Sequence, residues 1–204
     1  MKKVILHLCA DTGSDTQKYR ENGYEVILIG KDIGVENYHP PKFGIYGVIA
    51  NPVCTEFSTA RSTGKARNPT EGMKLVRECQ RIIEECNPVF WVIENPATGR
   101  LKDFLGPPNM TYEPWHYGSP WTKKTALWGK FNTPPKLYSN WEDVPKIEGL
   151  YTRPGRGKPS LAFMHKSHKK FIREFDCFKN VDSDMEFRSL CSQKFAQAFY
   201  EVNQ

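Results

Sequence analysis

The stretch from Tyr46 to Ile93 decides the fold. It begins with the apolar run Tyr46-Gly47-Val48-Ile49-Ala50, continues through a helical pattern from Gly72 to Cys86, and ends with Val89-Phe90-Trp91-Val92-Ile93. Apolar side chains recur along one face of the helical part: Met73, Val76, Cys79, Ile82, Ile83 and Cys86. A strand, a helix and a strand in this order form a βαβ unit, which implies parallel strands joined by a right-handed crossover. The stretch therefore predicts an α/β protein with a mostly parallel sheet.

The rest of the chain extends this pattern on both sides. Further strands are predicted over residues 4–8, 24–30 and, as a brief third strand, 33–35, with a short helix over 17–21 that ends at Asn22-Gly23. The segment 106–159 is rich in Pro, Gly, Trp and Tyr, so we expect it to be dominated by loops. A last helix is predicted from Ser192 to Val202. We predict a catalytic α/β domain over residues 1–132, a small basic extension over 133–185, and a closing segment over 186–204 that packs back on the first domain.

Reactive side chains follow the two strands of the deciding stretch. Asn51-Pro52-Val53-Cys54 comes directly after the first strand, and Glu94-Asn95-Pro96 comes directly after the second. Because open α/β sheets gather their chemistry in the crevice beyond the carboxyl ends of the strands, we expect Cys54 and Glu94 to lie close together. A thiol can act there as a nucleophile and a carboxylic acid as a proton donor to the same substrate.

Composition limits the function classes. The chain has 204 residues, 39% hydrophobic and 25% charged, which is ordinary for a globular protein. No apolar run approaches the roughly 18 residues that span a bilayer, and the N-terminus lacks the pattern of a signal peptide, so we expect no membrane partner and a cytoplasmic location. The six cysteines include no C-x-x-C pair, so we expect reduced thiols and no metal site.

The positive charge is concentrated in one part of the chain. The net charge is +6, and the segment from Arg153 to Arg173 carries basic side chains without an acidic residue. A phosphate backbone is the natural partner for such a strip, although a solvated basic face is the alternative. The candidate nucleic-acid-binding residues in this segment are Arg153, Arg156, Lys158, Lys166, Lys169 and Lys170.

Taken together, these segments resemble the DNA cytosine-5 methyltransferase superfamily, and most closely its short phage and prophage members. Leu6 to Ser14 is similar to the first motif of the superfamily, and Asn51 to Ser58 to its catalytic cysteine loop. Trp91 to Pro96 resembles its E-N-P segment, Tyr117 to Gly129 the basic segment that follows, and Arg188 to Asn203 the closing helix of the short members. The order of the five segments makes the resemblance specific.

The resemblance implies a Rossmann-like S-adenosylmethionine-dependent methyltransferase fold, with helices on both faces of the sheet. It assigns Cys54 as the nucleophile that adds to carbon 6 of cytosine and Glu94 as the partner of the ring nitrogen. Lys123 or Lys124 stands where the superfamily has an arginine near the base and its phosphate. Duplex DNA is the implied partner, with the target base flipped out. The implied S-adenosylmethionine-binding residues are Asp11, Thr12, Gly13, Ser14, Asp32, Asn51 and Pro52.

Two departures from the superfamily keep alternatives open. In the first motif, Cys9-Ala10-Asp11 replaces the aromatic residue and the pair of a small residue and glycine that the superfamily has there. Gly34 stands where an acidic residue is expected. The competing hypotheses are therefore a related pyrimidine-modifying enzyme, with another donor or a nucleotide substrate, and a DNA-binding module that has lost its catalytic activity. The short region after Phe131 cannot form a large base-reading surface, so we expect weak sequence specificity or a specificity partner protein.

Overall fold

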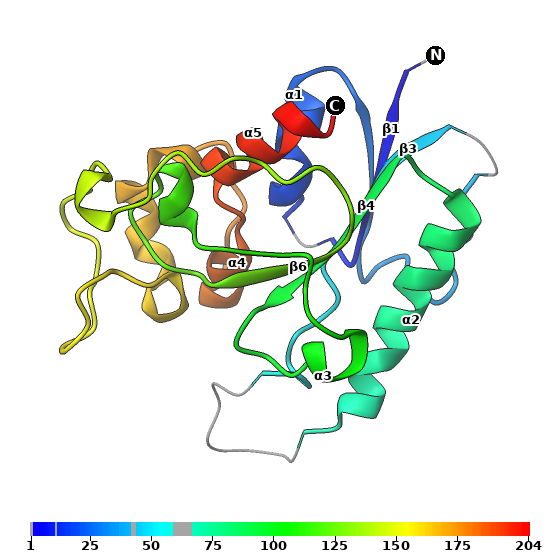
Figure 1. Ribbon diagram of the computed structural model, residues 1–204, viewed down its shortest axis with the longest axis horizontal. Helices are drawn as coiled ribbons and strands as arrows, with labels where there is room; N and C mark the ends of the chain where they lie inside the picture. Colours follow the sequence, from blue (N-terminus) through cyan, green and yellow to red (C-terminus); the bar gives the residue numbers. More distant parts are fainter. Residues whose placement is uncertain (1, 11, 42–43, 59–66) are drawn as a thin grey trace. The chain divides into compact units, whose positions relative to one another are not determined.

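The computed structural model describes residues 2–10, 12–41, 44–58 and 67–204. A six-stranded sheet has the order β2-β1-β3-β4-β6-β5. Neighbouring strands are parallel from β2 to β4, and β6 runs antiparallel to β4 (Figure 1). This mostly parallel sheet confirms the predicted Rossmann-like fold class. The strands are β1 (Val4–Leu8), β2 (Glu25–Ile29), β3 (Ile45–Ala50), β4 (Phe90–Pro96), β5 (Met110–Tyr112) and β6 (Thr125–Lys130).

The chain divides into two compact units. Unit 1 comprises Met1–Ala10, Tyr19–Thr111 and Thr125–Phe131, and unit 2 comprises Asp11–Lys18, Tyr112–Lys124 and Asn132–Gln204. Unit 1 carries β1 to β4 and β6, together with α2 (Pro69–Cys86) and α3 (Lys102–Leu105). The domain boundaries expected at residues 132 and 185 stay a prediction.

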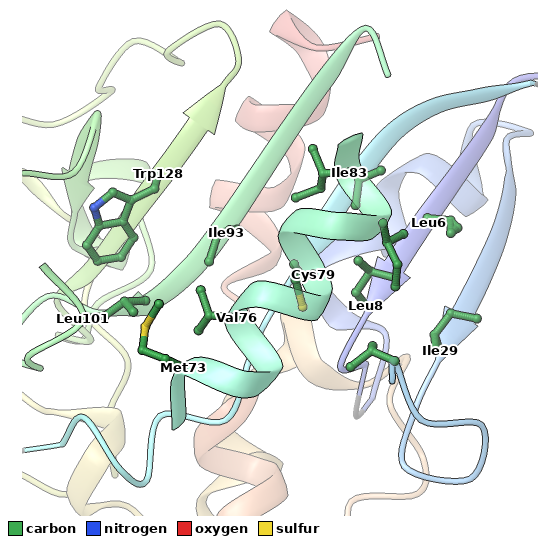
Figure 2. Packing of buried hydrophobic residues seen from close by; sticks show 14 of the residues in the cluster. Leu6, Leu8, Ile29, Met73, Val76, Cys79, Ile83, Ile93, Leu101 and Trp128 are labelled. Atoms are coloured by element: carbon green, nitrogen blue, oxygen red, sulfur yellow. The ribbon is translucent and has the colours of Figure 1, made fainter. Parts of the chain in front are cut away.

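The core of unit 1 lies between α2 and one face of the sheet (Figure 2). Val76, Cys79 and Ile82 of α2 are fully buried, which confirms the predicted apolar face of this helix. From the sheet, Leu6 and Leu8 of β1 pack against it (Figure 2). The helix begins with Asn68 as its cap, whose side chain accepts a hydrogen bond from the backbone N–H of Glu71, and ends at Asn87 in a left-handed conformation.

Side chains alternate between the two faces of the sheet along each strand, and this identifies the residues on the face opposite α2. Since Leu6, Leu8 and Ile93 point toward α2, His7 on β1 and Glu94 on β4 point away from it. Tyr19 of α1 (Gln17–Glu21) stacks on Phe90 of β4, with 5.7 Å between the ring centroids, on this second face. Helical residues thus cover both faces of the sheet, as predicted.

Unit 2 has a separate core made mainly of aromatic side chains. Trp121, Phe175 and Phe187 are fully buried and pack together. Its two α-helices are α4 (Asp184–Ser189) and α5 (Gln193–Val202), and α5 matches the helix predicted at the C-terminus. Unit 2 also contains short 3-10 helices at Ser14–Thr16, Pro114–Tyr117, Trp141–Asp143, Leu161–Phe163, Lys166–Phe171 and Arg173–Phe175.

Two expectations about the elements were wrong. Residues 33–35 form turns and not a strand, because Gly34 adopts a φ of 74° and its N–H donates to the carbonyl of Gly30. Strand β4 continues through Glu94-Asn95-Pro96, because β6 pairs with these residues. The segment 106–159 is dominated by loops, as expected, but it also contains β6, which was not predicted.

None of the helices in the described part of the chain is both long and apolar enough to cross a membrane.

Candidate active site

Two neighbouring strands of unit 1 bring the candidate residues together. Ala50, the last residue of β3, is paired with Ile93 of β4, so Asn51 and Glu94 come next on adjacent strands. The side-chain amide N–H of Asn51 donates to Oε2 of Glu94 over 3.2 Å. The other end of the same amide, Oδ1, lies 2.8 Å from Nε2 of His7 on β1. Three adjacent strands therefore meet at the Glu94 carboxyl group through side-chain hydrogen bonds.

A second hydrogen bond fixes the start of the cysteine loop. The amide N–H of Asn95, which is 1% exposed, donates to the backbone carbonyl of Pro52 over 2.9 Å. Oδ1 of Asn95 is buried and has no hydrogen-bond partner among the described residues. Because Pro52 lies two residues before Cys54, this bond holds the loop against β4 close to the proposed nucleophile.

The end of the cysteine loop is anchored by Phe57. The backbone carbonyl of Cys54 accepts hydrogen bonds from the N–H groups of Phe57 and Ser58, at 3.0 and 2.9 Å, and this closes a tight turn. Phe57 is fully buried, and its own carbonyl accepts from the N–H of Arg100. Cys54 stays partly exposed between the two anchors. A partly exposed thiol on a fixed loop, beside a strand that holds a carboxyl group, suits covalent catalysis.

The residues predicted to bind the cofactor fall in both units. In unit 1, Asp32 is exposed in the turn that follows β2, and its Oδ1 lies close to Gly30, 2.9 Å from the position that an added Cβ would take. In unit 2, Gly13 has a φ of 73° and precedes the 3-10 helix at Ser14. Thr12 is partly exposed beside it, and Asp11 lies outside the described residues.

Two of these predicted residues have side chains engaged within the protein. The hydroxyl of Ser14, which is 2% exposed, accepts from the N–H of Cys191 over 2.9 Å. Asn51 spans from His7 to Glu94, as described above. Their predicted contact with a cofactor stays a prediction, as does that of Pro52.

The two candidate lysines before β6 differ in their surroundings. The ammonium group of Lys123 donates to the carbonyls of Ser189 and Leu190, at 2.9 and 3.1 Å, and so closes the C-terminal end of α4. Lys124 is exposed and directly precedes Thr125, the residue that pairs with Pro96. Burial raises the pKa of the nearby Glu113 carboxyl, against the opposing effects of the Lys123 backbone N–H and of the Lys124 and Lys158 ammonium groups.

The basic strip of unit 2 is partly exposed and partly engaged. Arg153, Arg156, Lys166 and Lys170 are exposed, whereas Lys158 and Lys169 are half-buried. The ammonium group of Lys158 lies 4.5 Å from the ring centroid of Trp115 and 5.2 Å from that of Trp141.

An acidic residue from further along the chain balances part of this strip. Asp184 accepts from the backbone N–H of Lys166 and lies 2.8 Å from Nδ1 of His165. These bonds lower the pKa of Asp184, the Lys166 N–H being the largest cause. The sequence did not show this partner because it lies outside the strip.

No group of three His, Cys, Asp or Glu side chains in the described ranges is arranged to hold a metal ion. None of the six cysteines forms a disulfide bond. Cys79, predicted as a core residue, is fully buried, with its sulfur 3.8 Å from that of Cys9.

A curated protein is similar to this chain in sequence. No family model matches the chain. Over 146 residues the chain is 27% identical to a protein described as a probable DNA (cytosine-5)-methyltransferase from Frog virus 3 (isolate Goorha), which covers 63% of this chain. The resemblance to the DNA cytosine-5 methyltransferase superfamily is confirmed. The chain spans 65% of the length of this curated relative.

A solved structure also shows some similarity to the chain. It is described as a candidate DNA modification methyltransferase encoded within a prophage (E. coli), with 16% identity and a TM-score of 0.46 over 67% of this chain and 51% of that one. A TM-score below 0.5 does not establish a shared fold, so the fold assignment rests on the strand order and strand directions given above.

Sequence reasoning missed two residues of this candidate superfamily site. His7 was counted only as part of an apolar strand, although a histidine between buried leucines is a signal of a polar partner across the sheet. Asn95 was quoted as part of a motif without a role of its own. Its burial could be expected from the strand, but its bond to Pro52 depends on the pairing of β3 with β4.

Proposed function

We propose that this protein is an S-adenosylmethionine-dependent DNA (cytosine-5) methyltransferase in which Cys54 is the nucleophile and Glu94 the ring-nitrogen partner. The observation that carries the proposal is the pair of side-chain hydrogen bonds between the cysteine loop and β4, from Asn51 to Glu94 and from Asn95 to the carbonyl of Pro52. The methyltransferase relative supports the same reaction class. Since the chain spans only part of that relative, its activity on DNA stays a proposal.

The chemistry needs both residues. Addition of the Cys54 thiolate to carbon 6 of the ring forms an S–C bond and breaks the π bond between carbons 5 and 6. The displaced electron pair moves toward ring nitrogen 3, where Glu94 supplies a proton or a hydrogen bond. Carbon 5 becomes nucleophilic and takes up a methyl group. Loss of the proton from carbon 5 to a water molecule then restores the double bond and expels the Cys54 thiolate, and ring nitrogen 3 returns its proton to Glu94.

The residues of unit 1 fit part of a cofactor site. S-Adenosylmethionine, when bound, supplies an electrophilic methyl group. The Asp32 carboxylate, exposed at the carboxyl end of β2, is an acceptor suited to ribose hydroxyl groups, as acidic residues are at the second strand of dinucleotide sites. The first motif, Asp11 to Ser14, is assigned to the cofactor by resemblance alone.

The test is a covalent trap. A duplex that contains 5-fluorocytosine cannot lose a proton from carbon 5, so the enzyme should stay bound through Cys54 after methyl transfer. With S-adenosylmethionine present, we expect the wild type to form an adduct that survives a denaturing gel. Cys54→Ser should form none, and Glu94→Gln should form it about 100- to 10,000-fold more slowly, the range for loss of a general acid.

The same assay separates the competing hypotheses. An adduct that forms with other one-carbon donors but not with S-adenosylmethionine would favour the related pyrimidine-modifying enzyme. A folded wild type that binds the duplex without any adduct would favour the DNA-binding module. An adduct that persists in Cys54→Ser would contradict the assignment of the nucleophile.

A further inference from the structure

His7 is the polar exception in the first strand. It is 2% exposed, and its neighbours Leu6 and Leu8 are fully buried. Because those neighbours pack toward α2, His7 projects from the other face of the sheet, the face from which Glu94 projects. A buried imidazole needs a hydrogen-bond partner, and Asn51 provides one at 2.8 Å.

The direction of the hydrogen bonds follows from the chemistry of the end group. Asn51 presents its N–H₂ end to Oε2 of Glu94, which accepts the hydrogen bond over 3.2 Å, so a proton that Glu94 supplies to the substrate is carried on its other oxygen, Oε1. The carbonyl end, Oδ1, then faces His7, and the imidazole must carry its proton on Nε2 to donate to it. The tautomer of His7 therefore fixes the orientation of the Asn51 amide, and the amide fixes one oxygen of Glu94.

We propose that His7 and Asn51 are positioning residues that hold Glu94 for the methyl-transfer reaction through this directed chain of two hydrogen bonds. This inference rests on the proposed function. Neither residue needs to touch the substrate, since each acts through the next. The chain of hydrogen bonds links β1, β3 and β4, so the Glu94 carboxyl group is held by a buried histidine and a half-buried asparagine on the two neighbouring strands.

The resulting prediction concerns rate and not affinity. Loss of the donor on His7 removes one of the hydrogen bonds that orient the Asn51 amide, and the orientation of the Glu94 carboxyl group becomes less well defined. We expect His7→Leu and Asn51→Ala to slow adduct formation at saturating duplex by about 10- to 100-fold, because a misplacement on the order of 1 Å can reduce a rate by about 100-fold. The duplex concentration that gives half the maximal rate should not change. His7→Gln, which keeps an N–H donor near the position of Nε2, should retain most of the rate.

A double-mutant cycle distinguishes positioning from a general loss of packing. In a Glu94→Gln background, His7→Leu should cause no further loss of rate, because the group that the chain positions is already changed. Ile5→Ala is the matched control: Ile5 is fully buried two residues away on the same face of β1. It should lower the melting temperature at least as much as His7→Leu and leave the adduct rate of the folded protein unchanged.

The outcomes separate the two proposals. If the folded wild type forms no adduct with 5-fluorocytosine duplex, the proposed function fails and this inference fails with it. If the wild type forms the adduct and His7→Leu forms it equally fast, only the positioning role is overturned. Additive losses in the His7→Leu, Glu94→Gln double variant, or equal losses in His7→Leu and His7→Gln, would likewise overturn it.

Discussion

At the scale of single residues, Asp32 offers the most direct test of the cofactor proposal. We expect calorimetric titration with S-adenosylhomocysteine to show binding in the micromolar range, about −8 kcal/mol. Asp32→Asn should weaken this binding by about 10- to 100-fold, since a hydrogen bond to a charged group contributes about 1.5–3 kcal/mol. Glu36→Gln is the matched control, because Glu36 is an exposed carboxylate in the next turn. Equal weakening in both variants would mean that Asp32 contributes only charge.

The proposed reactive residues were easier to select from the sequence than the residues that contact them. Cys54 and Glu94 were proposed because each follows an apolar run and their side chains have distinctive chemistry. Asn51 was assigned to the cofactor, but its side-chain amide lies between His7 and Glu94. These partners are 44 and 43 positions away in the sequence. Their meeting depends on strand register, which local patterns do not specify.

At the scale of elements, α2 supports the cysteine loop at Gly72. A Cβ added there would lie 2.8 Å from the ring of Phe57 and 2.9 Å from Cβ of Glu56. In an unobstructed helix, glycine to alanine stabilises by about 1 kcal/mol. At this site we expect Gly72→Ala to lower the melting temperature, because the loop anchor must move, and to slow adduct formation through Cys54.

The control for Gly72→Ala is a substitution at an exposed position of α2, because α2 has no second glycine. Lys74→Ala lies on the exposed side of the same helix, and should change the melting temperature and the adduct rate little. A Gly72→Ala protein that is more stable than the wild type, with an unchanged adduct rate, would show that Phe57 yields without moving Cys54.

The bounds of helices and strands were predictable where local apolar runs and turn residues set them. They were not predictable where hydrogen-bonded pairing with a distant strand sets them. β1 and α1 match their predicted ranges because apolar runs and the Asn22-Gly23 stop mark them locally. β6 was missed since its sequence follows a loop rich in Pro and Gly, and only its antiparallel pairing with β4 makes it a strand. The same pairing draws Glu94, Asn95 and Pro96 into β4.

At the scale of the whole molecule, the net charge of +6 and the exposed basic residues of unit 2 predict salt-dependent DNA binding. Each lost phosphate contact should reduce the slope of log K against log salt by about 0.9. We expect the triple variant Arg153→Gln, Arg156→Gln, Lys170→Gln to reduce that slope by about 2 to 3, and to weaken binding to all duplex sequences about equally. A triple variant of Lys74, Arg77 and Lys102 to Gln, exposed cations of unit 1, removes the same charge. If it reduced the slope as much as the first triple variant, DNA binding would depend on net charge alone and not on the basic strip.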